Sequence, residues 1–175
     1  MSLRFVLNPE LTPTLRDQIV DLWVAVTNAG GAVGFVAPVT ADEVRPVAER
    51  TFADTTDGPD RLLVGYAGER PVAVLFFADN RFALSAHWGT LKRVMVHPDT
   101  QGRGYGRELM REAARRAPEL GWRALLVTIR GGQGLESFYG GLGFREVGRL
   151  PAALRVAPGD ERDEIVMWQD LATAN

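Results

Sequence analysis

The sequence contains no cysteine and only two histidines, His87 and His97. Without cysteine there is no disulfide bond, no thiol catalysis and no cysteine-based metal site. The two histidines lack the carboxylate pattern of a zinc site, so we expect no metal cofactor. Long apolar runs are also missing, and none reaches the roughly 18 residues that cross a membrane. We therefore expect no membrane partner.

The amino terminus lacks the charged region and long apolar region of a signal peptide, so we expect a cytoplasmic location. The chain has 175 residues, of which 46% are apolar and 24% are charged. These values are ordinary for a globular protein and allow one domain with its own core. We expect that single domain to span residues 1–175.

The net charge is −2, but it is unevenly distributed. Residues 1–90 contain seven basic and eleven acidic side chains, whereas residues 91–130 contain nine basic and four acidic ones. The positive stretch favours an anionic cofactor. Acidic residues interleave with the basic ones there, which argues against a nucleic-acid partner.

Apolar periodicity and turn residues predict an α/β fold with a mixed sheet of about seven strands and about four helices. Thr12 and Pro13 begin the first helix, and Thr40 with Glu43 forms a capping box at the start of the second. The predicted order is strand, helix, helix, three strands, helix, strand, helix and two strands. The strands are expected over 3–7, 61–67, 71–77, 91–96, 124–130, 145–150 and 164–171. The helices are expected from 13 to about 28, 40 to about 51, 104 to 117, and briefly before Phe138-Tyr139.

The most informative segment is a strand ending at Val96, followed by a glycine-rich turn and an amphipathic helix. Glycines at a helix start allow a ligand to approach the backbone, and the first helical amides point outward unpaired. This arrangement predicts a phosphate site. The segment lacks the Gly-Lys-Ser/Thr of a P-loop, and Arg107 stands where the dinucleotide fingerprint needs glycine.

The turn matches Gln/Arg-x-x-Gly-x-Gly/Ala through Gln101, Gly104 and Gly106, directly after Val94-Met95-Val96. This pattern resembles the acetyl-CoA-binding motif of the GNAT superfamily of N-acetyltransferases. The apolar run 124–130, the glycine-rich turn 131–134 and the helix ending in Phe138-Tyr139 resemble the second part of the same site. The resemblance implies an acetyl-CoA-dependent acetyltransferase.

The resemblance also implies residue roles. The backbone of Val94 and Val96 would bind the pantetheine arm, with an amide near Met95 or Val96 polarising the carbonyl. The pyrophosphate would bind amides of 102–107, and Tyr139 would protonate the departing thiolate. The expected cofactor-binding residues are Val94, Met95, Val96, Gln101, Gly102, Arg103, Gly104, Tyr105, Gly106, Arg107 and Phe138.

Most of these residues also have a purely structural explanation. Gly104 and Gly106 could simply form a turn. A glycine inside a helix lowers the stability of the helix by about 1 kcal/mol, however, so two of them at a helix start favour a functional explanation. Tyr139 could be an ordinary core tyrosine, and His97 most simply borders the loop. The basic residues of the following helix could form a solvated face, namely Arg107, Arg111, Arg115 and Arg116.

Within the superfamily the chain is similar to the tabtoxin-resistance type, which acetylates a small β-lactam-like toxin. The similarity covers 30–35, 95–110 and 138–151, and it implies a small amine acceptor. The chain departs from the pattern in three places, at Thr90, Thr128 and Gly132. The sequence does not identify the general base: Asp42, Glu43, His87 and a water relay stay open.

Two other functions stay open. The chain could acetylate protein N-termini or lysines, although Phe35 in the first loop favours a small acceptor. It could also be a non-catalytic acyl-CoA-binding regulatory module, because a fold does not determine a function. By resemblance a homodimer is expected, with Trp168 or the last strand as a candidate contact.

Overall fold

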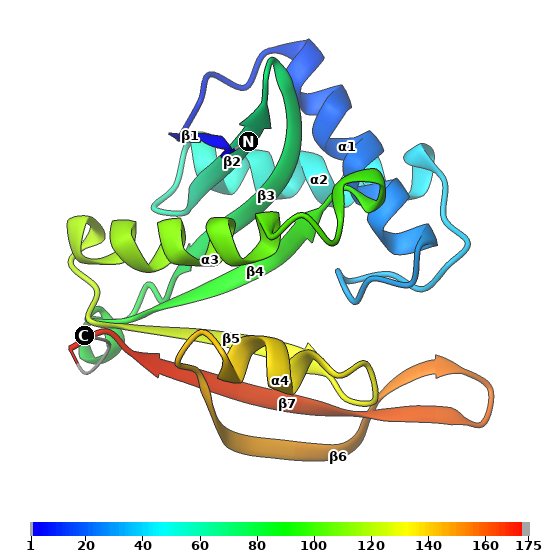
Figure 1. The fold of residues 1–175 in the computed structure, drawn as a ribbon, viewed down its shortest axis with the longest axis vertical. Helices are drawn as coiled ribbons and strands as arrows, with labels where there is room; N and C mark the ends of the chain where they lie inside the picture. Colours follow the sequence, from blue (N-terminus) through cyan, green and yellow to red (C-terminus); the bar gives the residue numbers. More distant parts are fainter. Residues whose placement is uncertain (1, 173–175) are drawn as a thin grey trace. The chain divides into compact units, whose positions relative to one another are not determined.

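The computed structural model describes residues 2–172, and its elements follow the predicted order (Figure 1). Over these residues it has seven strands and four α-helices in a mixed sheet of order β1-β2-β3-β4-β5-β7-β6. The predicted α/β class is therefore confirmed. The strands are β1 Arg4–Leu7, β2 Arg61–Ala67, β3 Arg70–Asp79, β4 Gly89–Val96, β5 Ala124–Arg130, β6 Arg145–Ala157 and β7 Asp160–Asp170. The helices are α1 Pro13–Asn28, α2 Ala41–Thr56, α3 Tyr105–Arg116 and α4 Leu135–Gly140.

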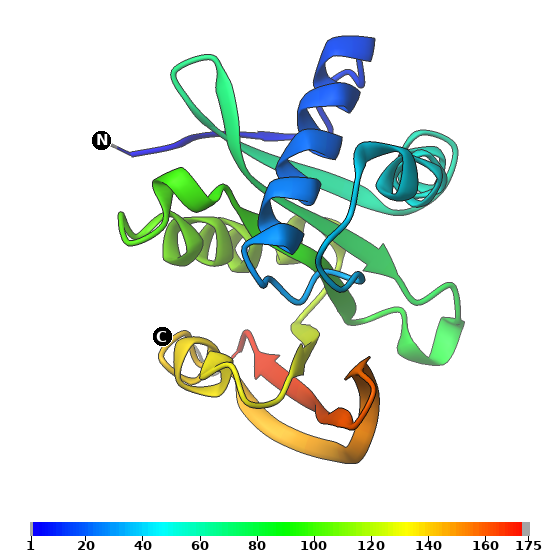
Figure 2. The ribbon, with the colours of Figure 1, turned by 90° about the vertical axis from the view of Figure 1, so that its right-hand side faces the viewer.

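The chain divides into two compact units. The first contains the residues up to Asp79 together with Lys92–Ala113, and the second contains Asn80–Leu91 and the residues from Ala114 onward. In the first unit, α1 and α2 cover one face of the strands and α3 lies on the opposite face (Figures 1 and 2). Trp23 of α1, Phe52 of α2 and Phe76 of β3 are fully buried or nearly so in the core between the helices and the strands.

The starts of α1 and α2 are formed as the sequence predicts. The Thr12 hydroxyl accepts a hydrogen bond from the Leu15 amide at 3.2 Å, and the Glu43 carboxylate accepts one from the Thr40 amide at 2.8 Å. The end of α2 differs, because the helix continues to Thr56 rather than stopping near Thr51. Burial of Phe52 favours this extra turn.

The second unit contains β5, β7 and β6 as antiparallel neighbours, with α4 packed against β5 and β6. The β6–β7 hairpin is longer than predicted at both arms. Cross-strand ion pairs of Arg155 with Glu161 at 2.7 Å and Arg149 with Asp163 at 3.0 Å accompany the extension. Such polar, exposed strands carry little apolar alternation, so hydrophobic periodicity does not predict them.

Gly89 of β4 lies so close to the Trp122 ring that it leaves no room for a side chain. A Cβ at this position of β4 would overlap the ring of Trp122, which is buried. We expect Gly89→Ala to lower the free energy of unfolding by about 1–3 kcal/mol, as overpacking does. Gly148→Ala in β6 is the matched control, because its Cβ would meet Val166 at an ordinary 3.9 Å. Urea denaturation measures the free energy of unfolding of both variants. Equal values would show that β4 can carry an alanine next to Trp122 without loss of stability.

Candidate functional site

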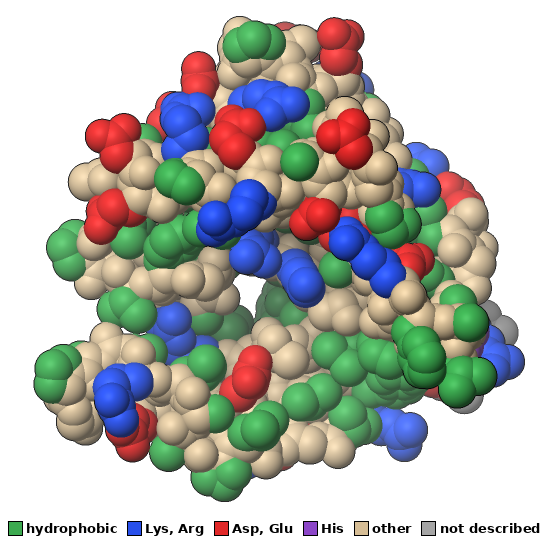
Figure 3. All heavy atoms as spheres, turned by 180° about the vertical axis from the view of Figure 1, so that it is seen from behind, with side chains coloured by type: hydrophobic (Ala, Val, Ile, Leu, Met, Phe, Trp, Pro, Cys, Tyr) green, Lys and Arg blue, Asp and Glu red, His purple; other side chains and the backbone are tan. Residues whose placement is uncertain are grey.

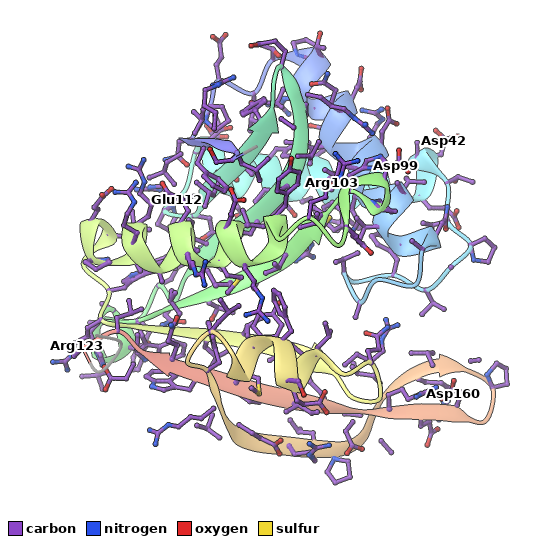
Figure 4. All side chains as sticks on the ribbon, in the orientation of Figure 1. Asp42, Asp99, Arg103, Glu112, Arg123 and Asp160 are labelled. Atoms are coloured by element: carbon purple, nitrogen blue, oxygen red, sulfur yellow. The ribbon has the colours of Figure 1, made fainter. Side chains whose placement is uncertain are left out.

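The loop after β4 is held by several local hydrogen bonds. The Thr100 hydroxyl donates to the His97 carbonyl at 2.9 Å, and the Asp99 amide donates to His97 Nδ1 at 3.3 Å. The Gln101 side chain turns back and donates from Nε2 to the Val96 carbonyl at 3.2 Å. The motif glutamine thus ties the glycine turn to the end of β4. Figure 4 shows Asp99 and Arg103 in this loop, which joins β4 to α3.

The glycine turn leaves an open cradle at the start of α3. Gly102 and Gly104 have φ values of +78° and +85°, which only glycine adopts without strain. A Cβ at either residue would meet nothing within 4 Å, so packing does not explain these glycines. The space lies open to a ligand.

The first hydrogen bond of α3 runs from the Glu108 amide to the Gly104 carbonyl at 3.1 Å. The amides of Tyr105 and Gly106 precede it and therefore have no acceptor within the helix. Gly106 lies in the first turn of α3, and the Tyr105 side chain is buried. Tyr105 is consequently placed to offer its backbone amide rather than its hydroxyl. An unpaired helix start of this kind suits a phosphate group.

The end of β4 departs from regular strand geometry at Arg93, which has a φ of +51°. A left-handed residue inside a strand is typical of a bulge, which disrupts the hydrogen-bond ladder locally. Val94 and Val96 beyond it are half-buried, whereas Met95 is fully buried in the core. Met95 can therefore contribute only backbone atoms to a site. No sequence signal marks an arginine for a left-handed conformation.

In the second unit, Tyr139 lies near the end of α4 with its side chain buried. Its ring makes edge-on contacts with Phe138 and Phe144, with centroid distances of 5.1 and 5.5 Å. Its carbonyl accepts hydrogen bonds from the Leu142 and Phe144 amides. Burial raises the pKa of the Tyr139 phenol, so the group is protonated at neutral pH.

The raised pKa of Tyr139 predicts a pH dependence of stability. The contribution of a protonated, buried phenol is fully present below about pH 10, where an unfolded tyrosine ionises, and is lost as the pH rises beyond it. Within that window the loss is about 1.4 kcal/mol per pH unit. We expect the free energy of unfolding of Tyr139→Phe to fall less steeply than that of the native chain above pH 10. Parallel curves in urea denaturation from pH 8 to 11 would contradict this expectation.

The candidates for a general base differ in their surroundings. The Glu43 carboxylate caps α2 through Thr40, so a structural role accounts for it. Asp42 is exposed in the first turn of α2 (Figure 4). His87 is exposed in the second unit. Neither observation selects a base.

Other sequence features have structural explanations. Arg115 and Arg116, at the end of α3, form ion pairs with Glu119, which fits a solvated helix face. Trp168, expected as a dimer contact, packs edge-on against Trp88 with centroids 5.3 Å apart. On the face shown in Figure 3, acidic and basic side chains are interspersed.

Among residues 2–172, no three or more potential metal ligands (His, Asp or Glu) come together. None of the helices in this range combines the length and the apolar character that a membrane span needs.

A strand, an open glycine cradle and a helix start with unbonded amides form, in an α/β protein, an arrangement that suits an anionic cofactor. A model of the acetyltransferase (GNAT) family matches residues 17–144. The chain therefore belongs to this family and is an acetyl-CoA-dependent N-acetyltransferase, with acetyl-CoA as its co-substrate.

Solved structures agree in fold. One, a protein assigned as a phosphinothricin N-acetyltransferase, has a TM-score of 0.80 at 20% identity, covering 97% of this chain and 99% of that chain. A protein from Salmonella typhimurium that is assigned as an acetyltransferase was solved with its cofactor acetyl-CoA. It has a TM-score of 0.75 at 19% identity, and the match covers 98% of this chain and 95% of that chain. A ribosomal-protein-alanine N-acetyltransferase from Brucella melitensis has a TM-score of 0.74 at 19% identity, covering 97% and 99%.

Proposed function

We propose that this chain transfers the acetyl group of acetyl-CoA directly to the primary amine of a small molecule. The observation that carries the proposal is the open cradle at Gly102 and Gly104, set at the unpaired start of α3. These residues fit a pyrophosphate because backbone amides and the helix dipole both favour an anion. We also propose that residues 1–175 form one functional domain.

Acetyl-CoA supplies an acyl group activated as a thioester. In the proposed mechanism, the amides of Gly102, Arg103, Gly104, Tyr105, Gly106 and Arg107 hold the pyrophosphate, and Gln101 fixes their loop to β4. The backbone of Val94 and Val96 aligns the pantetheine arm, and Phe138 contributes apolar contact to it. An amide near Met95 or Val96 donates a hydrogen bond to the carbonyl oxygen.

Tyr139 is the proposed general acid. The amine nitrogen forms the new bond to the carbonyl carbon, the carbon–sulfur bond breaks, and the Tyr139 hydroxyl gives its proton to the thiolate. The proton that the amine loses passes to solvent, which restores the phenol. At neutral pH the Tyr139 phenol carries the proton that this role requires, as a tyrosine with an ordinary pKa also does.

Similarity to the tabtoxin-resistance type and to the assigned phosphinothricin N-acetyltransferase supports a small acceptor. The similarity to a ribosomal-protein-alanine N-acetyltransferase keeps a protein N-terminus as the second candidate. Phe35 packs edge-on against Trp23 at 5.9 Å, so the first loop is anchored to α1 by an aromatic contact. An anchored, bulky loop suits a small acceptor better than an extended peptide.

We propose a homodimer as the assembly. The last strand, β7, was expected to contribute a contact, but it lies between β5 and β6 in the sheet. The edge strand beside it is β6, where Val147 and Leu150 are 52% and 50% exposed. Light scattering of the native chain measures its mass, and the mass of a monomer would contradict the proposed dimer.

A cytoplasmic location stays a prediction from the sequence.

The acceptor class is tested by measuring coenzyme A release with small primary amines and with peptides bearing free N-termini. Because the chain has no cysteine, a thiol reagent detects the released coenzyme A without a protein background. We expect kcat/KM to be higher for small amines. Higher values for peptides would favour protein acetylation, and acetyl-CoA binding without release would favour a regulatory module.

A further inference from the structure

Arg93 is a partly buried cation with no carboxylate paired to it among residues 2–172. Its Nε atom is buried and has no hydrogen-bond partner. Burial lowers the pKa of Arg93, and no neighbouring charge opposes that shift. Burying a charge costs free energy unless an opposite charge or hydrogen-bond acceptors compensate for the lost water. An anion bound next to Arg93 would provide this compensation.

The Arg93 side chain is nevertheless held in place. Its guanidinium carbon lies over the Trp23 ring, 4.9 Å from the ring centroid. Trp23 is itself fixed, since its Nε1 donates to the Val33 carbonyl at 2.9 Å. A Cβ on Gly34 would lie 4.0 Å from an Arg93 terminal nitrogen. Stacking on a ring restricts the guanidinium but satisfies none of its N–H groups, which remain available to oxygen acceptors.

The position of Arg93 along β4 indicates which molecule supplies the anion. In the proposed function, the pyrophosphate binds at 102–107 and the pantetheine arm runs back along Val96 and Val94. Arg93 is the next residue in that direction, at the acetyl end of the arm. The arm carries no charge, and all phosphates of the cofactor lie at or beyond its opposite end, where the pyrophosphate binds the glycine turn. An anion at Arg93 therefore belongs to the acceptor.

We propose that Arg93 binds a carboxylate of the acceptor, so that the acceptor is a small amino acid-like amine. This inference rests on the proposed function of the same site. A planar guanidinium matches a carboxylate with paired N–H···O bonds, which fix orientation as well as adding affinity. The arginine would then hold the amine in line with the carbonyl carbon, as a specificity-determining residue.

The test compares free L-amino acids with their carboxamides, which keep the amine and lose the negative charge. Coenzyme A release gives kcat/KM for each pair. We expect the native chain to prefer the free acid by about 10²-fold, because a site built for a polar group discriminates strongly against its loss. Arg93→Gln should abolish the preference through a raised KM for the acid, with the acetyl-CoA affinity unchanged. Arg93→Lys should retain part of it.

Lys92→Gln is the matched control, because it removes a positive charge from the adjacent, exposed residue. It should keep the native preference. Should Arg93→Gln fail to fold, the native preference and its reduction in Arg93→Lys decide the question.

Equal rates for acids and carboxamides, or an equal loss for both in Arg93→Gln, would overturn the inference. So would acetyl-CoA binding with no free acid acetylated, which leaves the proposed cofactor site standing. Absence of acetyl-CoA binding would instead overturn the proposed function, and this inference with it.

Discussion

Gly104→Glu is expected to abolish acetyl-CoA binding. The residue lies at the start of α3 with a φ of +85°, and nothing lies within 4 Å of a Cβ built there. The glutamate would therefore enter the open cradle rather than the core. A carboxylate placed at the pyrophosphate site repels it, and like charges in close contact cost several kcal/mol, or about 10²-fold or more in affinity.

Gly68→Glu is the control that separates this effect from backbone strain. Gly68 lies in the β2–β3 turn with a φ of +62°, and a Cβ there would also meet nothing within 4 Å. Each variant should lose about 1–2 kcal/mol of stability, because both force a side chain into left-handed backbone. Only Gly104→Glu should lose acetyl-CoA in calorimetric titration. Loss of binding in both variants, or in neither, would contradict a phosphate site at Gly104.

Tyr139→Phe is expected to lower kcat by about 10²-fold or more, the size of a general-acid contribution. The ring contacts with Phe138 and Phe144 are retained in this variant, so the placement of α4 should not change. Acetyl-CoA affinity should also stay the same. The measurement is the steady-state release of coenzyme A at saturating acetyl-CoA and amine.

Tyr66→Phe is the matched control for removing a phenolic hydroxyl. Burial raises the pKa of Tyr66 as well, but this residue of β2 has no proposed part in catalysis. It should turn over at the native rate. An unchanged kcat in Tyr139→Phe would remove the general-acid role and leave Tyr139 as a core residue.

The sequence predicts the element order well, because local residues such as Thr12 and Thr40 mark helix starts. It also predicts a glycine turn before α3, and Gly102 and Gly104 there adopt positive φ values. Whether this turn binds a phosphate stays a prediction. The helix end at Thr56 was predicted too early, because burial of Phe52 is a tertiary effect. The long β6–β7 hairpin was also underestimated, since ion pairs rather than apolar alternation accompany its outer half.

Arg93 shows what local reasoning misses at the candidate site. The position of its side chain over Trp23 depends on packing between β4 and α1, and nothing in the sequence marks its left-handed φ of +51°. Trp23 belongs to an ordinary apolar helix pattern, and seventy residues of sequence separate it from Arg93. Only the folded chain brings the two together.

The acetyl-CoA site is tested most directly by calorimetric titration of the native chain with acetyl-CoA, and separately with NAD and ATP. Titrations at two temperatures prevent a binding enthalpy near zero from being taken for absent binding. We expect saturable binding of acetyl-CoA in preference to either nucleotide. No acetyl-CoA binding would mean that Gln101–Gly106 forms only a turn, and it would contradict the assignment of this site.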